Sequence, residues 1–299
     1  MTMTDTLYQK TFKETLSAVG VGVHSGAKAT ITFRPAPANT GIIFKRTDVT
    51  GKNNEIPATY QYVVDTRMCS CFGNSDGVTV STAEHVMAAL HAYGISNAYI
   101  EVNGPEIPIM DGSAKDFAFL FDCAGLSEQR TPQKFLKIKR NVKFDDGKGA
   151  TASLSPADSG LELSFDIEFP AKIIGHQACN LKLTPQTFKE QIAIARTFGM
   201  KEDIERLRQI GLARGGSLDN AILVDKDKIV NPEGLREPKE FVFHKVLDAV
   251  GDLYQAGMPV IGRFYGNKSG HFHTNALLKQ VFSDKRNYEI IEAKPAGKN

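Results

Sequence analysis

The sequence predicts an α+β protein built from two similar domains, and two observations support this fold class. The chain has 299 residues, which is more than a single hydrophobic core usually organises. Its two halves also share one order of elements: several strands, then a helix, a strand, a loop and a second helix. We place the boundary near residues 127–134, where SEQRTPQK interrupts the pattern. The predicted domains are residues 1–130 and 131–285, with a flexible tail at 286–299.

The first half is predicted to begin with strands over residues 11–46, with turns at His24-Ser25-Gly26 and at residues 35–41. We interpret His24 as an ordinary turn residue. The segment VTVSTAEHVMAALHAY predicts a short strand followed by a helix that ends at Gly94. A strand at 97–102, a turn through 105–113 and a helix at 114–123 complete this half.

The second half is predicted to contain strands at 135–143, 152–154 and 161–169, and a helix near 185–195. A helix over 239–255 ends at Gly257, and a strand at 259–265 and a helix at 274–282 follow. This order of elements repeats that of the first half.

Composition indicates a globular protein outside the membrane. The chain is 41% hydrophobic with a net charge of +2, which argues against a dedicated nucleic-acid binder. No apolar run is long enough to span a bilayer, and MTMTDTLYQK lacks the apolar core of a signal peptide. The cysteines contain no CxxC pair, so we expect reduced thiols and a cytoplasmic protein.

The segment EFVFHKVLDAVGDL contains the main group of candidate functional residues. On a helix, His244, Asp248 and Asp252 fall within one arc, and Lys245 lies at its edge. His244 and Asp248 are four residues apart and can present an imidazole and a carboxylate to one metal ion. The alternative interpretation is a solvated polar face, and this helix alone favours that alternative.

The Glu84-His85 pair is the second group of candidate functional residues. A glutamate beside a metal-binding histidine can take a proton from an attacking water. The alternative is structural, because Ser81-x-x-Glu84 has the spacing of a helix capping box. The pair alone does not decide between these interpretations.

Together these residues suggest a catalytic metal site. His85, His244 and Asp248 provide three ligands and leave a fourth position open, which is typical of catalytic zinc. Glu84 would then be the base, and His271, in a glycine-containing loop, could be the acid. Two further residues could assist: Asp252 by orienting His271, and Thr197 by hydrogen bonding an oxyanion.

Six motifs together resemble the UDP-3-O-acyl-N-acetylglucosamine deacetylases of lipid A biosynthesis. They are VSTAEHVMAAL, PIMDGSA, ARTFGM, GGSLDNAI, HKVLDAVGDLY and KSGHFHTN, and the resemblance runs from about residue 11 to 282. It implies two ββαα-type domains with helices sandwiched between sheets and the active site at the domain interface. It also implies a zinc hydrolase that releases acetate from the glucosamine nitrogen of a UDP-linked, acylated N-acetylglucosamine.

The resemblance assigns roles to the same residues. It implies zinc ligands at His85, His244 and Asp248, with Fe²⁺ as an alternative metal. The catalytic residues it implies match Glu84, His271, Thr197, Lys245 and Asp252.

The resemblance also implies residues that bind the acylated substrate. Several residues after Thr197 match positions that line the family's lipid passage, although ordinary core packing is the alternative for Leu207 and Leu223. The substrate-binding residues expected on this basis are Phe198, Met200, Ile204, Ala213 and Ser217, with Phe165 on a strand resembling the one that contacts uracil.

Two features depart from the family pattern. Phe272-His273 stands where the family usually has Ala-Leu, so His273 is an alternative acid to His271. The family places a lysine after an Asp-Gly turn to contact the nucleotide, and the register of Lys148 relative to that lysine is unsettled. We expect a monomer with at most peripheral membrane contact. The alternative functions are a zinc amidohydrolase acting on another acylated sugar, or a sugar-nucleotide or acyl-binding protein without catalysis.

Overall fold

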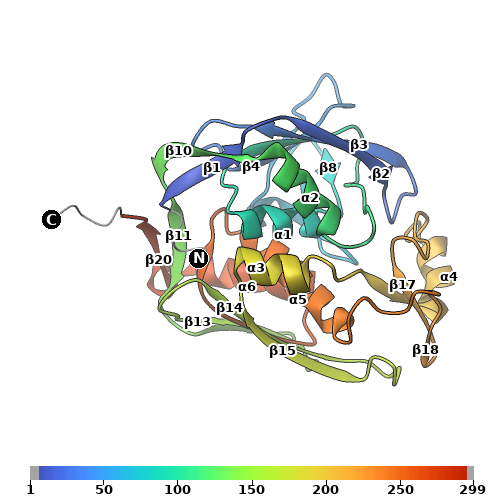
Figure 1. Cartoon of the computed structure of the whole chain (residues 1–299). Coiled ribbons are helices and arrows are strands. Elements are labelled where there is room, and N and C mark those ends of the chain that lie inside the picture. Colours follow the sequence, from blue (N-terminus) through green and yellow to red (C-terminus); the bar gives the residue numbers. More distant parts are fainter. Residues whose placement is uncertain (1–6, 295–299) are drawn as a thin grey trace.

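A computed structural model of the chain describes residues 7–294. Two layers of β-sheet enclose a layer of helices (Figure 1). This arrangement confirms the predicted α+β class with helices between sheets. Within residues 7–294, no helix has the length and apolar character needed to cross a membrane.

The first half of the chain forms the upper layer in Figure 1. Its main sheet has the order β2-β3-β9-β4-β5, and β6, β7 and β8 form a smaller sheet. Helices α1 (Glu84–Tyr93) and α2 (Lys115–Ala124) lie beneath it. The strands are β1 (Tyr8–Phe12), β2 (Leu16–Val21), β3 (Lys28–Pro35), β4 (Ile42–Arg46), β5 (Glu55–Pro57), β6 (Val63–Asp65), β7 (Cys71–Gly73), β8 (Thr79–Val80) and β9 (Ala98–Val102).

The second half forms the lower layer. Its sheet has the order β12-β13-β19-β11-β20, and β14 joins it beside β19 with β15 at the edge. Helices α5 (Glu240–Tyr254) and α6 (His271–Ser283) pack on its inner face. Its strands are β11 (Lys134–Ile138), β12 (Val142–Asp145), β13 (Thr151–Ser155), β14 (Leu161–Glu168), β15 (His176–Lys182), β19 (Val260–Asn267) and β20 (Tyr288–Glu292). The preceding strand, β10 (Leu126–Pro132), pairs with β1 in a separate two-stranded sheet.

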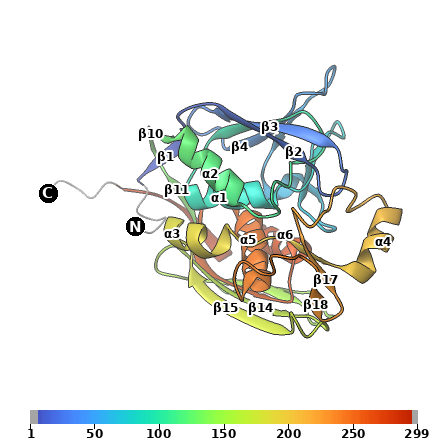
Figure 2. The same cartoon turned by 45° about the vertical axis from the view of Figure 1, so that its right-hand side comes forward.

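A smaller unit projects from the second half at the right of Figure 2. It contains a three-stranded sheet and helix α4. No residue of α4 is buried. Its elements are β16 (Phe198–Met200), α4 (Lys201–Gln209), β17 (Ile222–Asp225) and β18 (Lys228–Ile229).

Several boundaries differ from those predicted. The predicted tail is wrong over residues 288–292, which form β20 and pair antiparallel with β11; residues 295–299 lie outside the described part. The predicted boundary segment forms β10, which pairs with β1. The predicted helix at 185–195 is one turn, α3 (Pro185–Thr187), followed by a π-helix, η3 (Phe188–Ile192). Helix α6 begins at His271 rather than at residue 274.

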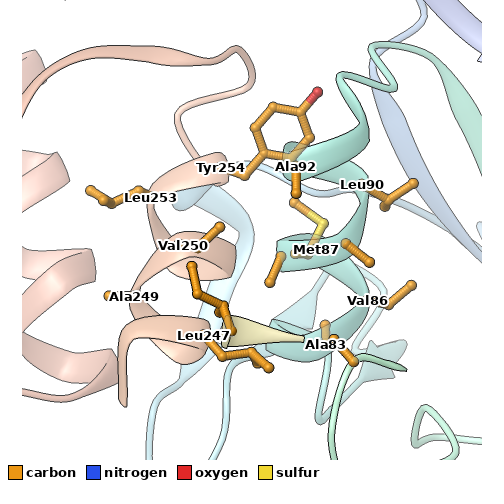
Figure 3. Close-up of a cluster of buried hydrophobic side chains, with 14 of the residues drawn as sticks. Ala83, Val86, Met87, Leu90, Ala92, Leu247, Ala249, Val250, Leu253 and Tyr254 are labelled. Atoms are coloured by element: carbon orange, nitrogen blue, oxygen red, sulfur yellow. The ribbon is translucent and has the colours of Figure 1, made fainter. Parts of the chain in front are cut away.

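Helices α1 and α5 cross at the centre of the molecule and join the two halves. Met87 of α1 lies between the helices with Leu247, Val250 and Tyr254 of α5 (Figure 3). Apolar surface removed from water contributes roughly 25 cal/mol per Å², so these buried side chains help to hold the halves together. The two helices that carry the candidate ligands are therefore fixed to each other.

His91 is a buried histidine in this seam. Its Nδ1 contacts the carbonyl oxygen of Val250 at 3.0 Å, and its ring stacks on Tyr254 with 4.6 Å between centroids. Burial lowers the pKa of His91 to about 4, although the hydrogen bond to Val250 opposes the shift. The folded protein therefore resists protonating a group that the unfolded chain protonates near pH 6.5.

We expect the free energy of unfolding of the metal-free protein to fall as pH drops from 7.5 to 4. The unfolded state binds the extra proton in this window, so His91 should account for about 3 kcal/mol of the loss. Urea unfolding of wild type and His91→Phe at both pH values measures this part, because other titrations cancel in the comparison. Equal losses in the two proteins would contradict the prediction.

Candidate functional site

Helix α5 is buried along almost its whole length, and this excludes a solvated polar face. Every residue of α5 except Lys245 is buried. Four of the buried residues are polar and follow each other at four-residue intervals: Glu240, His244, Asp248 and Asp252. Buried charged groups are costly unless they are paired or bind a metal, so this row requires specific partners.

Helix α1 approaches α5 closely because of a glycine. A Cβ added at Gly251 would lie 2.0 Å from the carbonyl oxygen of Glu84, so no larger residue fits there without movement. This contact brings the first turn of α1, with Glu84 and His85, beside the middle of α5. Two segments about 160 residues apart in the sequence thus supply one site.

The three predicted metal ligands lie together. Candidate ligand atoms of His85, His244 and Asp248 are all within 4.8 Å of one another, and all three residues are buried. The Oδ1 atom of Asp248 is 3.6 Å from Nε2 of His85 and 3.5 Å from Nε2 of His244. Nδ1 of His244 lies 3.1 Å from the carbonyl oxygen of Ala195, so we assign it as the donor. This tautomer leaves the Nε2 lone pair free for a cation.

The protonation states also fit a divalent metal ion. Burial lowers the pKa of His244 to about 3, so this imidazole is neutral. For Asp248, burial raises the pKa, but the ammonium of Lys245 and the other neighbours outweigh burial and hold the pKa well below its ordinary value. Neutral imidazole and ionised carboxylate are the forms that bind metals. The donor set therefore fits a metal ion with two histidines and one carboxylate.

A second buried cluster lies beside the ligands. Nδ1 of His271 is 2.8 Å from Oδ2 of Asp252, and Nε2 of His271 is 3.9 Å from Oε1 of Glu84. Asp252 also accepts hydrogen bonds from Oγ of Ser70 at 2.6 Å and from Nε2 of Gln255 at 3.0 Å. Asp252 is thus held by several neighbours and orients the imidazole of His271.

The cluster pairs a cation with a carboxylate. Burial lowers the pKa of His271, but the carboxylates of Asp252 and Glu84 outweigh it and raise the pKa to about 10. Burial raises the pKa of Glu84, and the charge of His271 opposes that shift. One group that can donate a proton and one that can accept a proton therefore face each other, as acid–base chemistry requires.

The capping role considered for Glu84 is wrong. The residue before α1 is Ala83, without a side-chain cap, and the hydroxyl of Ser81 donates to the carbonyl oxygen of Pro105 instead. Oε2 of Glu84 accepts the backbone N–H of Ser70 at 2.9 Å. The carboxylate therefore turns away from its own helix end and toward His271.

The three clustered residues His85, His244 and Asp248 line a cavity of about 350 Å³ together with Glu84 and His271. Lys245 and Thr197 are part of its wall, and Nζ of Lys245 lies 2.9 Å from Oδ2 of Asp248. Partial burial lowers the pKa of Lys245, but Asp248 outweighs this effect, so the pKa is raised and the ammonium stays charged. The cavity thus presents a carboxylate, an imidazole, a lysine and a hydroxyl around the three clustered residues.

Most of the predicted substrate-binding residues also line this cavity, but two do not. Phe198, Ile204, Ala213 and Ser217 are in its wall, together with Leu207 and Leu223. Met200 and Phe165 are absent from the lining, and the ring of Phe165 packs against Phe264 in the core of the lower layer. Phe165 is 2% exposed, and this burial speaks against a contact with substrate.

Comparison with known proteins then identifies the family. A family model described as UDP-3-O-acyl N-acetylglycosamine deacetylase matches residues 9–283. The chain belongs to this family. It is 48% identical over 275 residues to the UDP-3-O-acyl-N-acetylglucosamine deacetylase of Phenylobacterium zucineum, covering 92% of this chain and 93% of the relative. Identity is 46% over 290 residues with the namesake from Haemophilus ducreyi, covering 95% and 92%. With that of Myxococcus xanthus it is 48% over 286 residues, covering 96% and 90%.

Three residues of this deacetylase-family cavity and its surroundings were missed in the sequence. Ser70 and Gln255 hold Asp252, and His24, interpreted as a turn residue, lines the cavity. Gln255 could have been found, since it lies three residues after Asp252 on the same helix face. Ser70 and His24 stand in short irregular segments, where no periodic pattern indicates the direction of a side chain.

Proposed function

We propose that the chain is a zinc-dependent deacetylase. It hydrolyses the N-acetyl group of UDP-3-O-(3-hydroxyacyl)-N-acetylglucosamine, releases acetate and acts in lipid A biosynthesis in the cytoplasm. The observation that carries the proposal is the buried His85, His244 and Asp248 cluster beside the facing Glu84 and His271. The family membership and the deacetylase names of the relatives support this substrate.

The residues of the site divide the reaction between them. A bound divalent ion supplies Lewis-acid activation of the attacking water and of the amide carbonyl. Glu84 accepts a proton from the water as the new C–O bond forms. His271 donates its Nε2 proton to the amine nitrogen as the C–N bond breaks, which gives acetate and a free amine. Asp252 holds His271 in the orientation and charge state for this transfer.

The identity of the metal is part of the proposal. Two histidines and one carboxylate are the ligand set of several catalytic zinc sites, which supports Zn²⁺. The same donors bind Fe²⁺, so metal supply in the cell decides between the two ions.

Metal content and activity test the proposal together. We expect about one metal ion per chain and hydrolysis of the UDP-linked substrate with release of acetate. His85→Ala, His244→Ala and Asp248→Ala should each lose both metal and activity. His176→Ala is the matched control, because the His176 side chain is 64% exposed and outside the cavity, and it should lose neither. A folded wild-type protein that binds no metal would refute the proposal. Metal binding without hydrolysis would favour a binding protein or an amidohydrolase with another substrate.

Thr197 provides a narrower prediction. Its hydroxyl is placed at the cavity wall by two backbone hydrogen bonds, from Thr197 N–H to Gly112 at 2.7 Å and from Ile222 N–H to Thr197 at 2.8 Å. Loss of one oxyanion donor costs about 10²–10³ in kcat, and we expect the low end because a bound cation shares the charge. Steady-state kinetics of Thr197→Ala, with Thr197→Ser as the control, measures this effect. A rise in KM alone would mean that the hydroxyl binds substrate without stabilising the transition state.

We also propose that the enzyme is a monomer with at most peripheral membrane contact. The site supports this, because all of its groups come from one chain. A single species of about 33 kDa in analytical ultracentrifugation is the expected result.

A further inference from the structure

An ion pair lies buried behind the metal ligands, outside the cavity. Nε of Arg196 is 2.9 Å from Oε1 of Glu240, and Nη2 is 3.2 Å from Oε2. Arg196 is 2% exposed and Glu240 is 0% exposed. Replacing a buried ion pair by apolar residues is often neutral or stabilising, so stability alone does not explain why a pair stands here.

The carboxylate of Glu240 binds more than the guanidinium. Oε1 accepts the backbone N–H of Arg196 at 3.0 Å, and Oε2 accepts the backbone N–H of Arg236 at 2.7 Å. The guanidinium of Arg196 also donates to the carbonyl oxygen of Gly234 at 2.7 Å and contacts Glu233. The pair therefore fixes the backbone at Arg196 against the first turn of α5 and the segment before it.

The residues on both sides of Arg196 belong to the site. The carbonyl oxygen of Ala195 lies 3.1 Å from Nδ1 of His244, and Thr197 lines the cavity. Glu240 and His244 are one turn apart on α5, so one helix face carries both the ligand and the carboxylate that holds the ligand's partner. A shift of residues 195–197 would release the hydrogen bond at Nδ1 and move the hydroxyl of Thr197.

We propose that Arg196 and Glu240 are positioning residues for the reaction. Their ion pair holds the carbonyl oxygen of Ala195 against His244, which keeps the proton on Nδ1 and the lone pair of Nε2 directed at the metal site. The same pair sets the position of the Thr197 hydroxyl. The part that concerns Thr197 rests on the proposed function, whereas the part that concerns His244 does not.

The histidine tautomer is the direct readout. In metal-free wild-type protein, ¹⁵N NMR of the imidazole nitrogens should show His244 with its proton on Nδ1 alone. In Glu240→Gln, which keeps the side-chain shape but removes the charge, we expect both tautomers. The imidazole of His85 is the internal reference and should not change. A wild-type His244 that already populates both tautomers would overturn the proposal without any variant.

Metal affinity and kinetics give independent readouts. Loss of a partner that orients a metal-binding histidine weakens metal affinity or activity by about 10–100-fold, and we expect this range of Zn²⁺ affinity for Glu240→Gln. Arg196→Lys keeps the charge but loses the planar fork, so it should give a smaller loss. In the Glu240→Gln background, Thr197→Ala should cost less in kcat than in wild type, because the hydroxyl is already displaced.

Matched controls separate positioning from stability. Glu162→Gln breaks the exposed Arg263–Glu162 pair and should change neither tautomer nor Zn²⁺ affinity. Leu253→Ala, a core truncation in α5, should lower Tm without changing the His244 tautomer.

If Glu240→Gln lowers Tm but keeps the wild-type tautomer and Zn²⁺ affinity, the pair only stabilises the fold and the proposal is wrong. If Glu240→Gln does not fold, Arg196→Lys decides by the same measurements. A wild-type protein that binds Zn²⁺ without hydrolysing the substrate refutes the proposed function, and leaves the His244 result to stand.

Discussion

Replacing Glu84 by alanine is expected to lower kcat by a factor of about 10² or more while the protein still binds its metal ion. Glu84 is not one of the three clustered ligands, and its Oε1 faces Nε2 of His271 at 3.9 Å. The change removes the group proposed to take the proton from water and leaves His85, His244 and Asp248 in place. Kinetics and metal analysis of one preparation measure both effects.

Glu84→Gln is the control for this prediction. It keeps the hydrogen bond from the backbone N–H of Ser70 but cannot accept the proton, so it should lose as much activity as the alanine variant. A near-normal rate for Glu84→Ala would reduce this residue to a structural contact with Ser70.

The pH profile tests the acid and the base together. In the proposed reaction, activity requires ionised Glu84, so it should rise as pH increases through the Glu84 pKa, which burial raises above its ordinary value. It also requires protonated His271, so it should fall as pH increases through the His271 pKa, which is raised to about 10. A bound divalent ion lowers that pKa, so the basic limb should lie below this value. His271→Ala should flatten the basic limb, and an unchanged basic limb in this variant would assign the acid role to another group.

The alternative acid, His273, lies elsewhere. Its Nε2 is 3.3 Å from Oδ2 of Asp146 and its Nδ1 accepts the backbone N–H of Gly270, so both nitrogens have partners outside the ligand cluster. His273 is also absent from the cavity lining. His273→Ala is therefore expected to keep the basic limb that His271→Ala loses.

The residues of α5 were predictable because helix geometry is local. Positions 244, 248 and 252 lie on one face of any α-helix that contains them, so the sequence alone places an imidazole and two carboxylates along one face. Their burial was not predictable, because it depends on α1, whose approach is permitted by Gly251. The same applies to Glu84 and His271, which meet α5 only through the packing of the two halves. Their roles were suggested by the chemistry of the residue types, and the resemblance of whole motifs to a known family then implied the same roles.

The errors also have physical causes. Ser81 and Glu84 have the spacing of a capping box, but a parallel bridge between Ser81 and Glu106 holds Ser81 in extended structure. The strand at 288–292 is short, and β11, its partner, lies about 150 residues earlier in the chain. Strand formation depends on such non-local neighbours more than on intrinsic preference. Local patterns could therefore give the helices and their faces, but not the pairing of the last strand.

Helix α4 shows how the same apolar stripe can have different roles. Ile204 and Leu207 are only half-buried and line the cavity, so Leu207 does not belong to the core. Met200, which precedes the helix, packs against the hydrophobic core instead. Substrate contact is thus the better interpretation for Ile204 and Leu207, and core packing is the better interpretation for Met200.

Shortening the acyl chain of the substrate by four methylenes is expected to lower kcat/KM by about 10². The wall of the cavity beyond the ligands is apolar, with Ile204, Leu207, Ala213 and Leu223, and we propose that it takes this chain. Each buried methylene contributes about 0.8 kcal/mol, so four contribute about 3 kcal/mol, and 1.4 kcal/mol corresponds to a factor of ten.

Blocking this part of the cavity should act selectively on long-chain substrates. Ala213→Phe fills the space, but Ala213 has a φ of 53°, where a bulky residue adds backbone strain. Leu207→Trp, on the regular helix α4, avoids this strain and should lower kcat/KM for the long-chain substrate by about 10² while sparing an acyl-free analogue. Ile210→Trp is the matched control, because Ile210 ends the same helix, is 67% exposed and is outside the cavity lining. Equal losses on both substrates, or a rate independent of chain length, would mean that the acyl chain does not occupy this wall.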